Sequence, residues 1–237
     1  PPPPQPPPEP FVQPTPSPTP QPTAEPEATP APTITIPPRV QTTAPILDRT
    51  FGQGSGQGYI ALAAGSIKNA TDEPDSTIAS AAQGALSFTV TPGSPDPQVL
   101  ILHTHATETY QTWDTPVYDP DFTARTKDTT LNMCAVGEAM TKVLNDAGIT
   151  TLHDTTLHDS PSYTESYARS AQTARRYLEE YPSIKVVLDV HRDAMESGAA
   201  RVRPLTTLDG QPTAQVMIIA GCNNGGTVQV PIMRANF

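Results

Sequence analysis

The sequence predicts an α/β protein with a mostly parallel sheet and helices on both faces, preceded by a disordered Pro-rich tether and a short β-rich lead-in. The first observation is that nineteen of the thirty prolines lie in residues 1–45, a composition that buries too little apolar surface to fold. The second is that apolar runs of strand length alternate with segments of helical period from residue 97 onward. Such alternation is typical of a parallel sheet covered on both faces.

These observations divide the chain into three parts. Residues 1–48 are expected to form a semi-rigid tether in extended polyproline conformations, with a platform for proline-recognising domains as the alternative. Residues 49–95 are expected to be β-rich, with short strands at 59–69 and 86–91 between turn-forming residues. Residues 96–237 are expected to form the main domain, which is long enough to bury a core.

Periodicity predicts the elements of the main domain. Residues 129–147 and 162–181 place apolar side chains at helical spacing, so each segment is expected to form a helix. Short apolar runs around them predict buried strands. The expected strands span residues 98–102, 149–152, 184–190 and 214–220.

Histidines follow two of the predicted strands directly. His103 and His105 come after the first apolar run, Glu108 follows three residues later, and His191 comes after the strand at 184–190. The carboxyl ends of parallel strands meet at one edge of a sheet, where ligands bind in α/β proteins. A catalytic zinc takes three ligands from imidazoles and carboxylates and leaves one position for water. These four residues therefore form a candidate zinc site, and the alternative is that the histidines are structural.

Further polar residues are candidates for the same edge. Arg192 is suited to bind a substrate carboxylate through its planar guanidinium, and Asp193 to orient a ligating imidazole; alternatively, the two pair with each other or cap the next turn. His153 and His158 each precede an aspartate after the strand at 149–152. They are expected to contact substrate or to support the structure rather than to bind metal.

Composition and motifs argue against several classes of function. The net charge of −10, without a Lys/Arg cluster, argues against nucleic-acid binding. Cys134 and Cys222 are the only cysteines and form no CxxC pair, so they support neither a disulfide framework nor a cysteine zinc site. The sequence has no GxSxG motif that would indicate a serine nucleophile.

Three segments, in this order, resemble the stage II sporulation protein P family: HTHATETY, HDTTLHDSPSYTESYARS and VVLDVHRDA. GSIKNATD and VMIIAGCNNGG are also similar to the family. The resemblance implies a membrane-tethered, zinc-dependent peptidoglycan hydrolase with a fold like that of the N-acetylmuramoyl-L-alanine amidases. It also implies cleavage of the amide between muramic acid and L-alanine, and of peptide cross-links.

The resemblance also implies roles for residues. His103 and His191 match the histidines expected to bind zinc, Glu108 matches the acidic residue of the first motif, and His105 is the companion histidine. Whether the metal takes His103 or His105 stays open. The candidate catalytic residues are Glu108, Arg192 and Asp193, and the candidate substrate-binding residues are Arg192, His153 and His158.

One departure from the related amidases concerns their general base. They carry it as a Glu on a last strand with a pattern like LLIEVG, and no such strand precedes Phe237. The main domain is therefore expected to lack its C-terminal part, and to bind zinc while hydrolysing poorly.

The resemblance implies partners and a location as well. Peptidoglycan is the expected partner, together with stage II sporulation proteins D and M and, through an N-terminal anchor that precedes this sequence, a membrane. The expected location is extracytoplasmic, between the forespore and mother-cell membranes or in the cell wall. The alternatives are a non-enzymatic peptidoglycan-binding or scaffold module with the same fold, and a different metallohydrolase such as a phosphoesterase.

Overall fold

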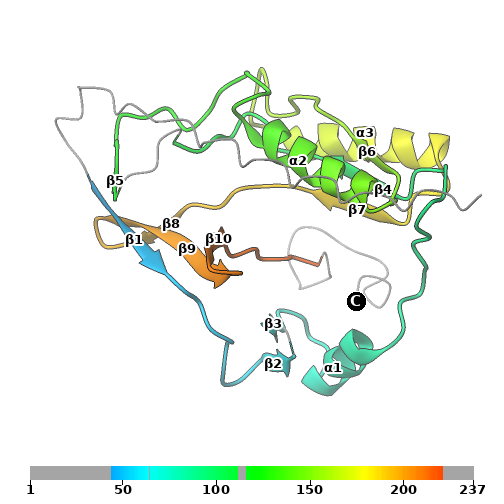
Figure 1. Cartoon of the computed structure of the whole chain (residues 1–237), viewed down its shortest axis with the longest axis horizontal. Helices are drawn as coiled ribbons and strands as arrows, with labels where there is room; N and C mark the ends of the chain where they lie inside the picture. Colours follow the sequence, from blue (N-terminus) through cyan, green and yellow to red (C-terminus); the bar gives the residue numbers. More distant parts are fainter. Residues whose placement is uncertain (1–43, 64, 112–115, 221–237) are drawn as a thin grey trace, which may run out of the picture. The chain divides into compact units, whose positions relative to one another are not determined.

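The computed structural model describes residues 44–63, 65–111 and 116–220 (Figure 1). The predicted tether lies outside these residues except for positions 44–48, which belong to the first strand, β1 (Ala44–Arg49). Within the described ranges, no helix is both long and apolar enough to cross a membrane. The chain is mixed α/β, as the sequence predicts.

A three-stranded parallel sheet forms the core of the main domain. Its strands are β4 (Val99–Leu102), β6 (Thr151–His153) and β7 (Val186–Asp189), in the order β6-β4-β7. The four residues of β4 are all buried, because the strand lies in the middle of the sheet with helices packed on it. The strands expected at 98–102, 149–152 and 184–190 are thereby confirmed.

Two helices cover this sheet. The predicted helices are confirmed as α2 (Met133–Asp146) and α3 (Ser166–Glu180). Leu100 and Leu102 of β4 belong to a buried apolar cluster that includes Ala174 of α3, whereas the side chain of His103 lies against Gly137 of α2. Since successive side chains of a strand point to opposite faces, the two helices cover opposite faces.

A second sheet combines strands from both ends of the described chain. It contains β1, β5 (Val117–Tyr118), β8 (Met195–Ser197), β9 (Ala200–Leu208) and β10 (Gln211–Ala214). Its main order is β10-β9-β1-β5, and β8 also pairs with β9. Only the β1–β9 pair is parallel. The prediction of a mostly parallel sheet is therefore correct for the core sheet and wrong for this one.

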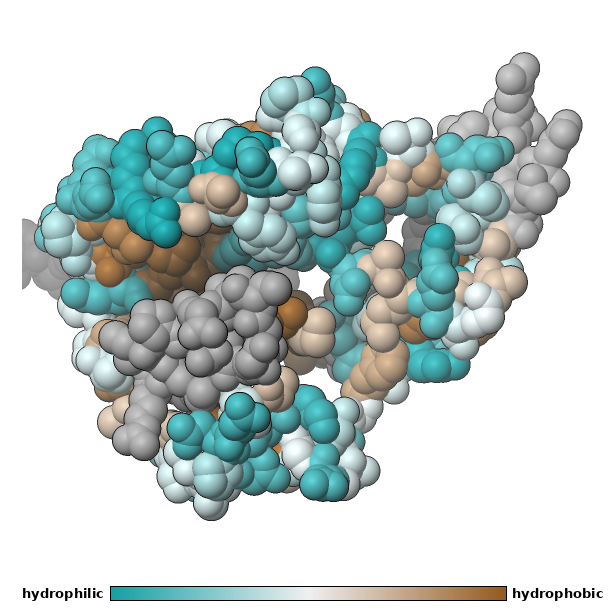
Figure 2. Space-filling model, turned by 180° about the vertical axis from the view of Figure 1, so that it is seen from behind, coloured by the Kyte–Doolittle hydropathy of each residue, from teal (hydrophilic) through white to brown (hydrophobic). Residues whose placement is uncertain are grey.

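The strand predicted at 214–220 is also wrong, since only Ala214 belongs to β10. The β9–β10 ladder ends at the pair Ala214–Leu205. The next residue of β9, Pro204, has no N–H to donate, and Val202 beyond it already pairs with β8. The apolar run Val216, Met217, Ile218 and Ile219 therefore pairs with no described strand and is 69–88% exposed. Apolar residues are visible at the surface in the space-filling view (Figure 2).

The lead-in differs from the prediction of short strands. The segment 59–69 folds as a hairpin of β2 (Tyr59–Leu62) and β3 (Gly65–Lys68). Residues 86–91 form no strand, and α1 (Asp75–Gln83), which the sequence analysis did not predict, follows the hairpin. Pro74 immediately before α1 and Asp75 in its first turn are the signals that would have indicated a helix start.

Candidate functional site

The candidate residues follow β4 and β7, which are adjacent parallel strands with Leu102 opposite Asp189. The N–H of Val190 donates to the carbonyl of Leu102 at 2.9 Å, so the pairing continues past the end of β7. The chain thus leaves both strands side by side. As the sequence predicts, the two strand ends meet at one edge of the sheet.

Two imidazoles and one carboxylate lie at this edge and are called here the His191 cluster: His105, Glu108 and His191. The ring centroids of His105 and His191 are 5.3 Å apart, and the charge of Glu108 acts on the pKa of both histidines. Tyr163 stacks on His105 with centroids 4.4 Å apart, and Tyr167 packs edge-on against it. Both tyrosines are more than half exposed, whereas His105 beneath them is buried and His191 is partly exposed.

The carboxylate of Asp189 holds His191 in place. His191 Nε2 lies 3.0 Å from Asp189 Oδ2, and Thr104 donates to the same carboxylate from its backbone N–H (2.8 Å) and its hydroxyl (2.6 Å). Because an ionised carboxylate only accepts, Nε2 carries the proton. The Nδ1 atom of neutral His191 is therefore the nitrogen with a lone pair for another group.

His103 belongs to a second group, the His103 cluster, with His153 and Glu138. Its side chain is fully buried, its Nε2 is 2.9 Å from His153 Nε2, and His153 Nδ1 is 3.3 Å from Glu138 Oε2. Gly137 of α2 makes this packing possible, because a Cβ at that position would lie within 2.5 Å of His103 Nε2 and closer still to His153 Nε2.

Hydrogen bonding fixes the tautomer of His103. Its Nδ1 donates to the carbonyl of Val190 at 2.9 Å. Burial lowers the pKa of His103 below its usual value, so the ring is neutral and Nε2 accepts from His153. Both nitrogens of His103 are thus engaged inside the protein. In this arrangement His103 has no lone pair available for a metal.

Arg125 enters the site from a loop that the sequence analysis did not single out. Its Nη1 donates to the fully buried carboxylate of Asp159 at 2.8 Å and to Thr107 Oγ1 at 3.2 Å. Its Nη2 donates to Glu108 Oε1 at 3.2 Å, and its guanidinium carbon lies 5.2 Å from the centre of the Tyr163 ring. Asp159 also accepts from Thr107 at its backbone N–H and its hydroxyl. This network fixes the segment that carries Glu108.

The environment shifts the pKa values of His105 and His191 in opposite directions. The hydrogen bond to Asp189 raises the pKa of His191 and outweighs the effect of burial. Burial lowers the pKa of His105 despite the nearby charge of Glu108. For Asp189, burial acts to raise the pKa, but hydrogen bonds from His191 and Thr104 outweigh it and hold the pKa below its usual value.

The other predicted site residues lie in different surroundings. Arg192 Nη2 donates to the carbonyl of Ala124 at 3.4 Å, while its Nε is buried without a hydrogen-bond partner among the described residues. Asp193 is exposed and accepts from the N–H of Ala194. His158 is buried, with Nδ1 at 2.8 Å from the carbonyl of His103 and Nε2 at 2.9 Å from Thr173 Oγ1. His158 therefore supports the His103 segment.

The donor types at the edge match those of a catalytic zinc. His105, His191 and Glu108 supply two imidazoles and one carboxylate, a set that leaves a fourth position for water. Over the described part of the chain, no three His, Cys, Asp or Glu side chains already converge to hold a metal ion. The donor chemistry thus fits zinc, and the three side chains would have to converge on the ion.

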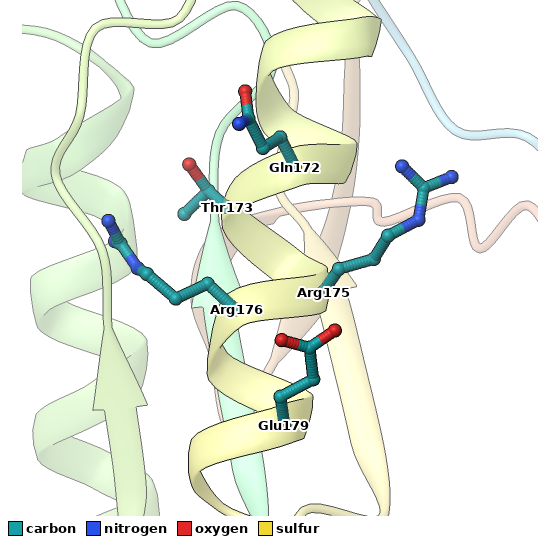
Figure 3. A pocket seen from close by; sticks show the side chains of 5 residues that line it. All are labelled: Gln172, Thr173, Arg175, Arg176 and Glu179. Carbon is teal, nitrogen blue, oxygen red and sulfur yellow. The ribbon is translucent and has the colours of Figure 1, made fainter.

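The surface hollow on α3 is separate from these residues. A hollow of ≈ 570 Å³ is lined by Gln172, Thr173, Arg175, Arg176 and Glu179 (Figure 3). All five belong to α3, and none is a predicted site residue. The hollow contributes nothing to the site.

Sequence reasoning missed Asp189, Arg125 and Gly137. Asp189 is the last residue of β7, and His191 follows two positions later. If the chain stays extended, this spacing places both side chains on one face, which was a signal in the sequence. Arg125 and Gly137 gave no comparable signal, because their importance comes from contacts with residues far along the chain.

The fold and the strand-end cluster describe an α/β protein with a polar site at the edge of a parallel sheet. The family model of stage II sporulation protein P (SpoIIP) matches residues 59–236. No curated protein and no solved structure matches the chain. The chain belongs to the SpoIIP family, which confirms the resemblance and gives it a role in sporulation.

Proposed function

We propose that the chain is a cell-wall hydrolase that cleaves the N-acetylmuramoyl-L-alanine amide of peptidoglycan with a zinc-activated water. Cleavage of peptide cross-links is part of the same proposal. Membership of the SpoIIP family supports a sporulation-related role. The observation that carries the proposal is the placement of His105 and His191 with ring centroids 5.3 Å apart at the ends of adjacent parallel strands.

The proposed metal ligands are His105, His191 and Glu108. His191 would bind through Nδ1, because Asp189 engages Nε2. His103 is the less suitable of the two histidines in the first motif, since both of its nitrogens are engaged. A carboxylate behind a ligating histidine orients the ring and strengthens it as a ligand. Asp189 supplies that carboxylate, a role expected for Asp193 from sequence alone.

A zinc ion bound there would lower the pKa of its water towards ~7 and polarise the amide carbonyl. Arg192 is the proposed donor to a substrate carboxylate, because its Nε is buried without a partner among the described side chains. Tyr163 and Tyr167 border the cluster. Arg192, Tyr163 and Tyr167 would position the amide of the substrate beside the metal.

The remaining parts of the proposal concern the setting. Peptidoglycan is the proposed partner, and stage II sporulation proteins D and M are proposed to act with the chain. The proposed location is extracytoplasmic and membrane-tethered. Family membership supports a place in sporulation, and the acidic net charge of −10 agrees with a partner other than nucleic acid.

Zinc content per folded chain, measured by elemental mass spectrometry, tests the proposal. We expect about one zinc per chain, lost in His105→Ala and His191→Ala. The matched controls are His153→Ala and Glu138→Gln, which change the His103 cluster and should keep the zinc. Glu108→Gln should weaken zinc binding, because a neutral amide is a poorer ligand than a carboxylate.

A peptidoglycan digest then tests the reaction. Mass spectrometry of the products should show slow release of free muramic acid lactyl groups and of stem peptides that begin with L-alanine, since poor hydrolysis is expected from the sequence, and a chelator should abolish this release. A folded chain that keeps its zinc in His191→Ala would contradict the proposed ligands. Peptidoglycan binding that neither a chelator nor His191→Ala affects would favour the non-enzymatic wall-binding alternative.

A further inference from the structure

Arg125 is held beside the His191 cluster by backbone pairing. Arg125 and Glu108 form an isolated antiparallel bridge, in which the N–H of Thr109 donates to the carbonyl of Ala124 at 3.1 Å and that of Thr126 to the carbonyl of Thr107 at 2.7 Å. Backbone hydrogen bonds on both sides of Arg125 thus fix where its side chain begins.

The two terminal nitrogens of the Arg125 guanidinium, Nη1 and Nη2, make different contacts. Nη1 contacts the buried Asp159 at 2.8 Å and Thr107 at 3.2 Å, so this end is anchored inside the protein. Among the described residues, Nη2 makes one contact, with Glu108 at 3.2 Å, which is longer than the ~2.7–2.9 Å usual for a charge-assisted hydrogen bond. The Arg125 side chain is 42% exposed. Its outer end therefore has donor capacity for an incoming group.

This outer end lies one aromatic ring away from His105. Tyr163 stacks on His105 and also has the Arg125 guanidinium over its ring. The charges of Glu108 and Arg125 both act on His105. A ligand that bound Arg125 would accordingly contact the same edge of the sheet as a ligand that bound the His191 cluster.

A second arginine, Arg192, contacts the backbone of the loop that carries Arg125. Arg192 Nη2 contacts the carbonyl of Ala124, the residue before Arg125. Two arginines therefore flank the site of a chain whose net charge is −10. A pair of planar cations matches the geometry of carboxylates, and charge of this sign selects acidic ligands.

We propose that the outer end of Arg125 binds a carboxylate of the peptide part of the substrate, in exchange for its single contact with Glu108. The proposal rests on the function proposed above, in which the bond cleaved joins a sugar acid to an acidic stem peptide. A free substrate carboxylate offers two oxygens to the guanidinium, whereas Glu108 offers one. Arg125 is then a specificity-determining residue, and acidic stem peptides are preferred over amidated ones.

Isothermal titration calorimetry with two soluble probes tests this preference. The probes are N-acetylmuramoyl-L-alanyl-D-glutamate with its γ-carboxyl group blocked as a methylamide, and the α-amide of the same compound, so that only the first carries a free carboxylate. The whole chain should bind the acid roughly tenfold more tightly than the amide, as expected for loss of a charged hydrogen bond. Arg125→Gln should bind both probes within about twofold of each other.

The controls separate charge, folding and the proposed function. Arg175→Gln on the exposed face of α3 should keep the full preference, and Arg125→Lys should keep part of it, since a lysine supplies the charge without the planar fork. Circular dichroism melts show whether each variant folds. The preference of the unaltered chain for the acid over the amide is measured without any variant, so it does not depend on the folding of one.

Equal binding of the acid and the amide by the unaltered chain would overturn the role of Arg125 and leave the amidase proposal standing. An unchanged preference in folded Arg125→Gln would also overturn it. A zinc-loaded chain that binds neither probe would contradict the proposed substrate, and the role of Arg125 with it.

Discussion

The His103 cluster and the His191 cluster begin within two residues of each other and yet have opposite characters. His103 is fully buried against α2, and both of its nitrogens are hydrogen-bonded. His105 is also buried, but it lies beside the partly exposed His191 and under the exposed ring of Tyr163. The comparison shows that proximity of histidines in sequence does not make them one site, because the chain turns at residues 104–107, directly after His103, and so directs the two rings differently.

We expect mutations in the two clusters to affect different properties of the protein. The His103 cluster joins α2 to two strand ends, so its side chains should contribute to the free energy of unfolding. In the His191 cluster, Asp189 holds His191 and Arg125 contacts Glu108, and the side chains of the cluster should contribute to binding. The following changes test this division in order of expected effect.

His103→Ala should lower the free energy of unfolding by about 2–4 kcal/mol, because it opens a cavity and leaves His153 without its buried partner. His191→Ala, the control, should cost about 1 kcal/mol or less, since that ring is partly exposed. Urea denaturation followed by circular dichroism measures both. Equal losses in the two variants would remove the distinction between the clusters.

Gly137→Ala should cost about 1–3 kcal/mol through overpacking, because the added methyl group would meet both imidazoles of the His103 cluster. Gly52→Ala is the control, since a Cβ at residue 52 meets no atom within 4 Å. Zinc content in folded Gly137→Ala should stay at the level of the unaltered chain. A loss of zinc without a loss of stability would show that the metal binds at the His103 cluster and that the proposed ligands are wrong.

Asp189→Asn should lower the pKa of His191 towards its ordinary value, because the carboxylate that favours the imidazolium is replaced by a neutral amide. Asp193→Asn is a matched control at the same spacing on the other side of His191. Its side chain accepts from Ala194 and should leave that pKa unchanged. Titration of the histidine ring signals by NMR distinguishes the two, and a shift in the Asp193 variant alone would reverse the assignment.

The pH dependence of stability should also reflect the His103 cluster. Burial lowers the pKa of His103 in the folded chain, so the unfolded chain takes up this proton at a higher pH than the folded one. His103 therefore favours folding above its ordinary pKa of ~6.5 and disfavours it increasingly as the pH falls below that value. His103→Gln should flatten this part of the stability–pH curve, and an unchanged curve would contradict the buried, neutral ring.

The sequence determined the elements of the core sheet and the edge where its polar residues gather. Strands such as Val99–Leu102 are continuous apolar runs because both faces of a parallel sheet are covered, and α2 and α3 show their helical period directly. The motifs HTHATETY and VVLDVHRDA indicated the family. These features are local in the chain, and so the sequence displays them.

Tertiary structure alone decided which histidines share a site. His103 pairs with His153, fifty positions away, and Asp159 joins Thr107 to Arg125. It also decided that the apolar run after Ala214 would not pair, because Pro204 and β8 end the ladder on β9. No local pattern specifies such contacts, since they depend on which side chains the folded backbone brings together.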